Sequence, residues 1–501
     1  MVLRYHGPMD GDFEEKGAYN CCTNCRRKEV STNNSKKSIL LTMKAFGISV
    51  VLSLTFLALQ NSAHAQDVDP LASNNGIYPS PNEWSGPFRI SNLDYSQASI
   101  SNHWTPGAGR GALTTENAES YVLDLKEHLA ESLKEMINTP LQWNPKENGW
   151  YDMVWSGHGS PGPGNTTDPN SGRESLLSSY TGQILPMNTF AEHAPTVNVQ
   201  NHAVIYYNAT AAVMLGRLWE NLYDPDISDV DFPQGSIIVK AEAATPTPEQ
   251  WPVLARASIW NVYRPSVETQ ENAKSGEPLK PEVLDLRALQ MSIAVKDTIA
   301  SPETGWVFLG YVYDTKAPGD TPWDKFVPLG AQWGNDPEFA NNETGRDPAG
   351  GPLKETWVNP KAPEFVQDTL GWGERLAGPM DVATRHNVLT PSGKRYQGNV
   401  HLRASSCISC HGSAEFPFTT NLYPSPNKSF PPDGMPFLLY DPGSPEWAQW
   451  FQNRPGNEAM SSEGRVGITA LDYDMVIMFA LSAFNAAMGN DIYVQSRFDV
   501  H

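Results

Sequence analysis

The clearest periodic pattern in the chain predicts an amphipathic helix over residues 114–140. Thr114 or Thr115 is expected to cap its start, and Pro140 lies just past its end. Further helices are predicted in the second half of 202–223, from 444 onwards and near 469–488. In the first helix, apolar residues recur at the three- and four-residue steps of a single buried face, namely Val122, Leu125, Leu129, Leu133, Met136 and Ile137.

A different pattern, made of β-branched and aromatic runs, predicts strands at 235–243, 289–297 and 305–314. The last two runs are joined by TIASPET, so we expect them to pair as antiparallel neighbours. The 41 prolines and 39 glycines indicate many turns and long ordered loops. The patterns together predict an α+β fold, with an antiparallel, β-rich domain, flanking helices and long ordered loops. The segment 326–338 is distinctive, but the sequence assigns it no role.

The N-terminal residues are typical of an export signal and not of a folded domain. Met43 and Lys44 precede an apolar run over 45–59, and Ala63-His64-Ala65 matches the small-x-small pattern of a signal-peptidase site. The alternative interpretation of the apolar run is an uncleaved N-terminal anchor. We therefore expect four segments: a disordered upstream extension over 1–42, a signal peptide over 43–65, a loop-rich and helical region over 66–224, and a β-rich haem domain over 225–501 closed by C-terminal helices.

The chain expected after cleavage near Ala65 is strongly acidic. Residues 1–65 hold eight of the 36 Lys/Arg and five of the 56 Asp/Glu, which leaves 28 basic and 51 acidic residues and a net charge of −23. So strong a negative field excludes nucleic acid as a partner and disfavours anionic lipid. The apolar runs of 45–59 and of the helix near 469–488 are both shorter than a membrane span requires, so we expect no membrane span in the mature chain.

Two cysteines carry the main chemical signal. Cys407, Cys410 and His411 form Cys-x-x-Cys-His, the attachment motif of c-type haem. Thiols one helical turn apart reach the two vinyl groups at one porphyrin edge, and the next residue supplies the imidazole below the iron. One covalent haem c is therefore predicted, attached after export to the periplasm or beyond.

Two other interpretations of the motif are weaker. A thioredoxin-type redox pair is expected between a strand and a helix of a βαβ unit, and HLRASSCISCHGSAEFPF has no apolar strand before the motif. A zinc site needs further cysteine or histidine ligands at close spacing, which the neighbouring sequence lacks.

The sixth position of the iron decides between two functions. An electron carrier fills it with Met or His, whereas a ligand-binding or catalytic haem leaves it open. Met435, in PPDGMPF, is the best candidate, and its alternative role is core packing. The remaining candidates are histidines with ordinary surface or hydrogen-bonded roles as their alternatives: His158, His202, His386 and His401.

The order of the segments FPQGSIIVK (232–240), SIAVKD (292–297), TGWVFLGYVYD (304–314) and a C-terminal Cys-x-x-Cys-His resembles that of cytochrome P-460 and the related cytochromes c′-beta. The resemblance covers about 90 residues and the haem motif. It implies an exported, antiparallel β-rich, dimeric protein whose five-coordinate haem binds or oxidises small nitrogen species such as nitric oxide and hydroxylamine. It also implies a covalent bond from Lys240 to the haem, with Trp306 and Phe308 lining the pocket.

Three departures from the family pattern restrict which of the family's properties can be expected of this chain. Ala241 separates Lys240 from Glu242, where the family has adjacent lysine and glutamate, and about 90 residues separate the last strand from Cys407. The proton-transferring carboxylate of the hydroxylamine-oxidising members has no clear counterpart, since Ser406 precedes the motif and Glu415 follows it. A solvated lysine at a strand end is the alternative interpretation of Lys240.

The sequence thus predicts an exported monohaem c-type cytochrome with electron-transfer or redox chemistry and a possible open site for nitric oxide or hydroxylamine. The alternative is a six-coordinate His/Met electron carrier without catalysis. Whether the protein is an enzyme stays open; an enzyme built this way is a haem-dependent oxidoreductase. The partner is expected to be a redox protein or a small-molecule ligand.

Overall fold

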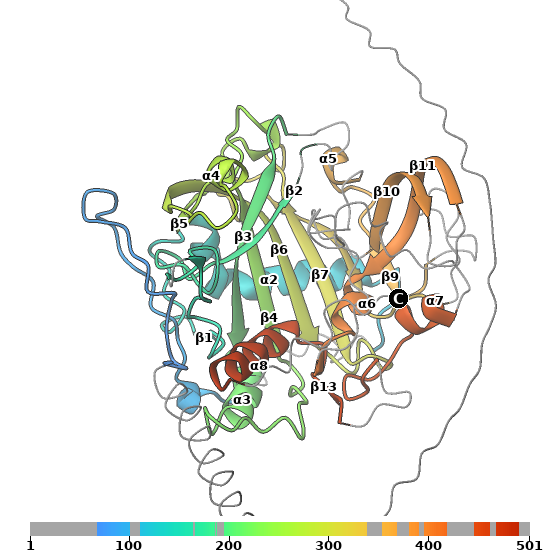
Figure 1. Ribbon diagram of the computed structural model, residues 1–501. Coiled ribbons are helices and arrows are strands. Elements are labelled where there is room, and N and C mark those ends of the chain that lie inside the picture. Colours follow the sequence, from blue (N-terminus) through green and yellow to red (C-terminus); the bar gives the residue numbers. More distant parts are fainter. Residues whose placement is uncertain are drawn as a thin grey trace, which may run out of the picture. The chain divides into compact units, whose positions relative to one another are not determined.

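A nine-stranded antiparallel sheet organises the fold (Figure 1). Its main path runs β1-β3-β4-β6-β7-β8-β9, with β2 paired to β3 and β5 paired to β6. The computed structural model describes residues 68–100, 111–163, 166–185, 187, 195–337, 353–367, 380–389, 395–417, 445–460 and 467–489. The strands are β1 (Trp150–Tyr151), β2 (Tyr180–Leu185), β3 (Val199–Asn208), β4 (Ile237–Ala244), β5 (Ile259–Arg264), β6 (Glu282–Lys296), β7 (Trp306–Tyr313), β8 (Phe326–Gln332) and β9 (Thr356–Val358).

The α+β class predicted from the sequence is confirmed, since helices accompany this antiparallel sheet. The three predicted strands are β4, β6 and β7, which lie side by side in that order. The last two pair in antiparallel fashion from Lys296↔Trp306 to Gln290↔Val312, as the TIASPET connection indicated. The strands β1 to β3 lie before residue 225 and belong to the same sheet.

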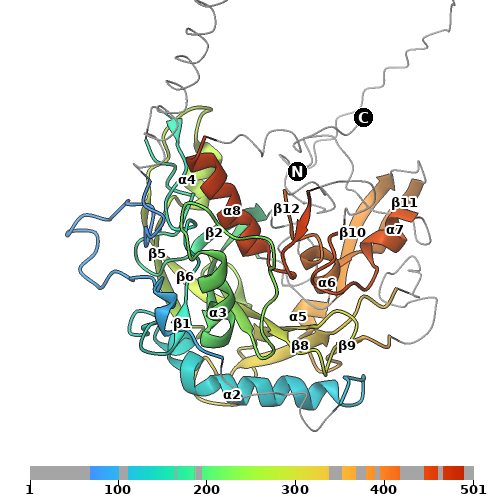
Figure 2. The same cartoon turned by 90° about the horizontal axis from the view of Figure 1, so that it is seen from below.

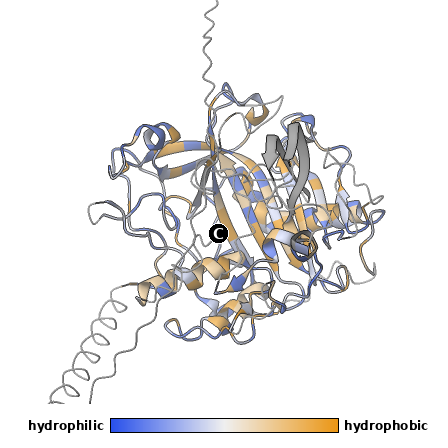
Figure 3. Ribbon diagram, turned by 45° about the vertical axis from the view of Figure 1, so that its right-hand side comes forward, coloured by the Kyte–Doolittle hydropathy of each residue, from blue (hydrophilic) through white to orange (hydrophobic). Residues whose placement is uncertain are grey.

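Side-chain alternation along β4 assigns the two faces of the sheet. Ile237 and Val239 are buried in the core beneath one face, whereas Ile238 packs with a second cluster on the other face. Because successive residues of a strand point to opposite faces, Lys240 and Glu242 lie on the face of Ile238. Hydrophobic residues extend along the central strands (Figure 3), which explains why both faces of the sheet need a covering layer.

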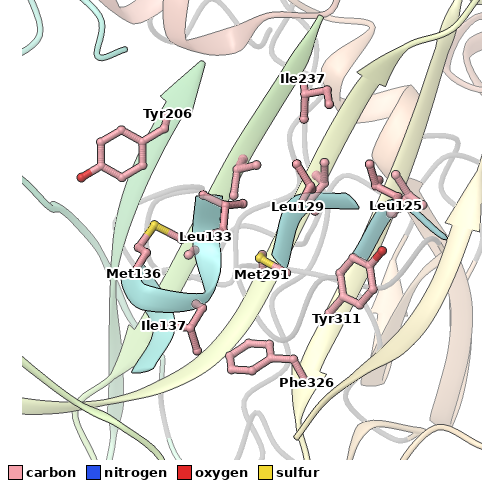
Figure 4. Close-up of a cluster of buried hydrophobic side chains, with 14 of the residues drawn as sticks. Leu125, Leu129, Leu133, Met136, Ile137, Tyr206, Ile237, Met291, Tyr311 and Phe326 are labelled. Carbon is pink, nitrogen blue, oxygen red and sulfur yellow. The ribbon is translucent and has the colours of Figure 1, made fainter. Parts of the chain in front are cut away.

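The first face is covered by α2 (Ala118–Asn138), which crosses the strands (Figures 1 and 2). Its predicted apolar stripe is buried, and Leu125, Leu129 and Leu133 point at the strands that carry Met291 and Tyr311 (Figure 4). The predicted cap was wrong: the N-cap is Asn117, whose side-chain oxygen accepts a hydrogen bond from the backbone of Thr114.

The second face carries α3, α8 and the short helix α6, which contains the haem motif (Figure 2). The predicted helix in the second half of 202–223 is α3, and β3 precedes it directly. The final helix is buried on one side only, because Phe479 is 55% exposed. These helices are α3 (Ala209–Leu218), α4 (Val267–Asn272), α5 (Glu364–Gln367), α6 (Cys407–His411), α7 (Pro445–Trp450) and α8 (Met475–Ala487), and the 3-10 turns are η1 (Tyr95–Gln97) and η4 (Pro252–Leu254).

Two small strand pairs complete the C-terminal half. The hairpin of β10 (Met380–Leu389) and β11 (Arg395–Ser406) leads directly into α6. The pair of β12 (Glu415–Phe416) and β13 (Thr469–Ala470) joins the end of the haem motif to the segment before α8. Among the helices in the described ranges, none is both long and apolar enough to cross a membrane.

The packing of α2 gives the first prediction. Leu129 is 2% exposed and Leu123, on the same helix, is 47% exposed. We expect Leu129→Ala to lower the free energy of unfolding by about 2–5 kcal/mol, because it removes buried methyl groups and leaves a cavity. The matched change Leu123→Ala is expected to cost less than about 0.5 kcal/mol. Denaturant titration measures both, and equal losses would contradict the assignment of the buried face.

Candidate functional site

The haem motif forms α6, a five-residue helix whose two sides differ in burial. Ile408 and Ser409 are fully buried against the protein, whereas Cys407, Cys410 and His411 are half-buried. The three half-buried residues are spaced i, i+3 and i+4, so they share one side of the turn. Neither thiol is in a disulfide. Cys407 packs with the apolar cluster on the second face of the sheet, whereas Cys410 packs against Trp450, Phe451 and Met460.

Local sequence explains why the helix begins at Cys407. The hydroxyl of Ser406 accepts a hydrogen bond from the backbone N–H of Ser409, and the hydroxyl of Ser409 accepts one from the backbone of Ser406. This reciprocal arrangement is a capping box, with serine in place of the usual acidic residue at its third position. The cap halts β11 and starts the helical turn at the first cysteine.

The end of β8 docks this helix onto the sheet. The backbone N–H of Ile408 donates to Gln332 Oε1 at 3.0 Å, and the hydroxyl of Ser406 donates to Asn335 Oδ1 at 2.6 Å. Gln332 and Asn335 are fully buried. They lie in the distinctive 326–338 segment, for which the sequence gave no role. Its function in the fold is to hold the haem motif at a fixed place.

Asn335 is itself held from both sides. Its backbone N–H donates to Asn453 Oδ1 at 2.7 Å, and its side-chain amide donates to the carbonyl of Gln452 at 3.0 Å. The next residue, Asp336, has a φ of 47° and accepts hydrogen bonds from the backbone of Lys354 and Glu355. We call Gln332 and Asn335 the clamp on α6. Through Asn335 the clamp joins segments more than a hundred residues apart.

His411 is oriented by a backbone carbonyl. Its Nδ1 lies 2.9 Å from the oxygen of Tyr473, and its ring centroid lies 4.7 Å from that of Phe308. A carbonyl oxygen only accepts hydrogen bonds, so Nδ1 carries the proton and Nε2 keeps its lone pair. An N–H to carbonyl bond of this kind fixes the tautomer of metal-binding histidines.

The surroundings of His411 favour the neutral imidazole. Burial lowers its pKa to about 4, the hydrogen bond to Tyr473 opposes that shift, and the charge of Lys240 adds to it. At neutral pH the ring is therefore unprotonated at Nε2, the form that binds a metal. Lys240 and His411, which the sequence singled out separately, therefore interact electrostatically.

Lys240 lies in the interior of β4, so the expectation of a strand-end position was wrong. Its ammonium group is 2.5 Å from Glu242 Oε1, and its side chain is 44% exposed. The Glu242 carboxylate also accepts a hydrogen bond from Asn201 at 3.0 Å. Lys240 is thus half-buried and paired with a buried carboxylate, which is not the environment of a freely solvated lysine.

The sheet around Lys240 is incompletely covered. Across the strands, Lys240 pairs with Ile205 on one side and Ser292 on the other, and Ser292 pairs with Gly310. We call five adjacent, only partly buried residues of this face the sheet floor: Ile205, Ile238, Lys240, Ser292 and Ala294. Directly beneath them, the residues on the opposite face of β4 and β6 are fully buried. Cys407 packs against the same cluster as Ile205, Ile238 and Ala294.

The sheet floor is partly exposed, and Ile205, Ile238 and Ala294 belong to the same apolar cluster as Cys407. Two thiols, an imidazole and apolar neighbours are the residue types that a covalent haem needs. Cys407 and Cys410 would hold such a group, and His411 would be the ligand of its iron.

The other candidate ligands lie in different places. Met435 falls outside the described residues, as do the side chains of His386 and His401 in the β10–β11 hairpin. His202 is fully buried on the α2 side of β3, in line with Val204, and burial lowers its pKa to about 3. That face is opposite to Lys240, so His202 is separated from the sheet floor by the sheet itself.

His158, Phe308 and Trp306 are the other side chains that the sequence singled out. His158 is half-buried, with its ring 6.0 Å from that of Trp155. Phe308 contacts the imidazole of His411, and Trp306 donates its indole N–H to Asp472 at 2.8 Å. In the described part of the chain, no group of three or more His, Cys, Asp or Glu side chains is placed to hold a metal ion.

No family model, curated protein or solved structure matched the chain.

The docking of α6 gives the second prediction. We expect Ser406→Ala to lower the free energy of unfolding by about 1–3 kcal/mol, because the helix loses its cap and Asn335 Oδ1 loses its donor in a buried place. Ser266→Ala is the matched control, since Ser266 caps the short helix α4 away from this site. That loss is expected to stay near or below about 1 kcal/mol. Thermal or denaturant unfolding measures both, and a Ser406 variant as stable as the parent would contradict the clamp.

Proposed function

We propose that the protein is an exported monohaem c-type cytochrome. Cys407 and Cys410 form the thioether anchors, and Nε2 of His411 is the proximal iron ligand. The observation that carries the proposal is the Nδ1–H of His411 donating to the carbonyl of Tyr473, which leaves the lone pair of Nε2 available to an iron. A haem bound there supplies a one-electron redox couple and an iron that binds small ligands when its sixth position is open.

Each side chain has a task that follows from its position. The clamp of Gln332 and Asn335 fixes the thiols relative to the sheet. The sheet floor excludes water from one face of the site with Ile205, Ile238 and Ala294. The ring of Phe308 lies tilted against the imidazole and restricts its rotation. Export through the predicted signal of 43–65, with cleavage near Ala65, agrees with haem attachment in the periplasm or another exported compartment.

A second candidate function is favoured by Lys240. It belongs to the partly exposed sheet floor, its ammonium group pairs with Glu242, and its charge lowers the pKa of His411. We propose on this basis a five-coordinate haem of the type that the P-460 and c′-beta resemblance implies, binding nitric oxide or hydroxylamine. A bond from the Lys240 amine to the porphyrin would replace its pairing with Glu242. A homodimer and a redox protein partner belong to the same proposal.

The longer separation between β7 and the haem motif departs from the family pattern, and its described residues contain further elements. These are β8, β9, α5 and the β10–β11 hairpin, and β8 carries the clamp residues. The separation of Lys240 from Glu242 by Ala241 also has a structural effect, because it places both side chains on the same face. These features are compatible with a haem site of that type in a longer chain.

Covalent attachment is tested by the third prediction. Expressed with a c-type haem maturation system, the parent should gain the mass of one haem that survives denaturation. The double variant Cys407→Ala/Cys410→Ala should gain none, because both thioethers are lost. Replacing Cys21, Cys22 and Cys25 with Ser should change nothing. Pigment fully extracted from the parent by acid–acetone, or a colourless mature protein, would overturn the proposal.

The state of the sixth position is tested by the fourth prediction. Addition of carbon monoxide to the ferrous protein should change its absorption spectrum if the distal site is open. A low-spin ferrous spectrum unchanged by the gas supports instead a six-coordinate electron carrier, with Met435 as the candidate ligand. Peptide mapping should find a fragment that contains both Lys240 and porphyrin, and the variant Lys240→Arg should lack it. A parent without that fragment removes the cross-link from the proposal.

A further inference from the structure

The carbonyl that orients His411 belongs to an unusual turn. Residues 471–474 close a tight turn in which the N–H of Asp474 donates to the carbonyl of Leu471 at 2.9 Å. The two central residues, Asp472 and Tyr473, have φ values of 46° and 67°. Positive φ at both positions is found in type I′ turns, where Asn, Asp and Gly are preferred. Tyrosine is unfavourable there, so the surrounding contacts must hold the turn.

Asp472 makes most of those contacts. Its carboxylate oxygens lie 2.7 and 2.8 Å from the ammonium of Lys296, which is 7% exposed. It also accepts hydrogen bonds from the indole of Trp306 at 2.8 Å and from the backbone of Phe232 at 2.7 Å. The carboxylate of Asp472 is thereby tied to the end of β6, the start of β7 and the segment before β4.

Gly456 leaves room for this carboxylate. A methyl group at Gly456 would lie 1.7 Å from Asp472 Oδ1, and the carbonyl of Gly456 accepts the N–H of Asp472 at 3.2 Å. The chain therefore approaches Asp472 as closely as a residue without a side chain allows. Any larger residue at 456 would push the carboxylate, and the turn with it, away from its position.

Tyr473 transmits the position of the turn to His411. Its hydroxyl donates to the carbonyl of Arg454 at 2.7 Å, and its ring centroid lies 6.2 Å from that of Phe308. Asp474, the next residue, caps α8 by accepting the N–H groups of Val476 and Ile477. The Tyr473 side chain and Asp474 are thus held by their own contacts. A change in the conformation of Asp472, the other central residue of the turn, should therefore redirect the Tyr473 carbonyl.

We propose that Asp472, held by Lys296, is a positioning residue that sets the strength of the hydrogen bond from His411 Nδ1 to Tyr473, and with it the electron donation of the imidazole to a bound iron. This inference rests on the proposed haem function. A stronger bond from Nδ1 raises the basicity of the ligand nitrogen and stabilises the ferric state. Loosening the turn should therefore make the haem easier to reduce.

The experiment compares two substitutions in the haem-loaded protein. Gly456→Ala displaces the carboxylate without changing any charge, and Asp472→Asn keeps the shape and the tolerance of positive φ but removes the ion pair. The midpoint potential of each is measured by spectroelectrochemistry. We expect the equilibrium constant for reduction to rise about tenfold in both, which corresponds to about 59 mV for a one-electron couple.

Two controls separate positioning from other effects. Asp231→Asn removes the same charge from the same ammonium, since Asp231 Oδ1 lies 3.0 Å from Lys296 Nζ, but it leaves the turn untouched. Gly216→Ala adds a methyl group within α3, 3.3 Å from Tyr95 Cβ and remote from the turn. Both should change the reduction equilibrium by less than about twofold. Asp231 is 63% exposed, so solvent screens its charge.

The outcomes distinguish the inference from the function on which it rests. Raised potentials in Gly456→Ala and Asp472→Asn, with unchanged controls, support positioning through the turn. Variants that carry covalent haem and melt at lower temperature but keep the potential of the parent show a structural role only and overturn the inference. A shift in Asp472→Asn matched by Asp231→Asn shows a field effect and also overturns it. A parent without covalent haem instead overturns the proposed function.

Discussion

The buried ion pair of Lys296 and Asp472 joins the two parts of the molecule on which the candidate site depends. Lys296 ends β6 in the centre of the sheet, and Asp472 lies in the turn before the last helix. Burying two charges costs free energy, which close contact and further hydrogen bonds offset. Here Trp306 and Phe232 supply those bonds. Removing one partner of such a pair leaves an uncompensated charge and costs about 3–5 kcal/mol, so the turn is strongly held in place.

That energy is what allows an unfavourable backbone to persist. Asp472 and Tyr473 both occupy the left-handed region, at a cost of about 1–3 kcal/mol each. The strain places a carbonyl where the imidazole of His411 needs one. The other side of α6 is held differently, by neutral amide and hydroxyl contacts from Gln332 and Asn335. The motif is thus fixed both by the end of β8 and by the C-terminal segment, which also holds Asn335.

Local patterns predicted the framework and suggested the chemistry of the site. The 3.6-residue periodicity of α2, the β-branched runs of β4, β6 and β7, and the Cys-x-x-Cys-His spacing are signals within a few residues of one another. The start of α2 was misplaced because Asn117 occupies the N-cap position without a side-chain capping bond, its oxygen accepting from the backbone of Thr114 instead. The fold class could therefore be predicted from the sequence, whereas the haem-binding role of Cys407, Cys410 and His411 stays a prediction.

The supporting residues could not be predicted, because their contacts are distant in the sequence. His411 meets a carbonyl 62 residues later, and Gln332 meets a backbone group 76 residues later. A backbone carbonyl has no sequence signature. Lys296 stands at the end of an apolar strand, where a lysine is ordinarily solvated, so its burial could not be expected. The distinctive segment 326–338 was a local hint, but it does not indicate its partner. The position of Lys240 opposite small residues likewise emerges only from strand register.

The order of elements along the chain has a consequence for biogenesis. The sheet floor is encoded before residue 295, the thiols appear at 407 and 410, and the carbonyl for His411 arrives only at 473. If the proposed export and haem attachment hold, a chain that crosses the membrane with its N-terminus leading presents both sulfurs before residue 473 has followed. Haem attachment could then precede the contact that orients the imidazole, so that closure of the last turn would be the later event.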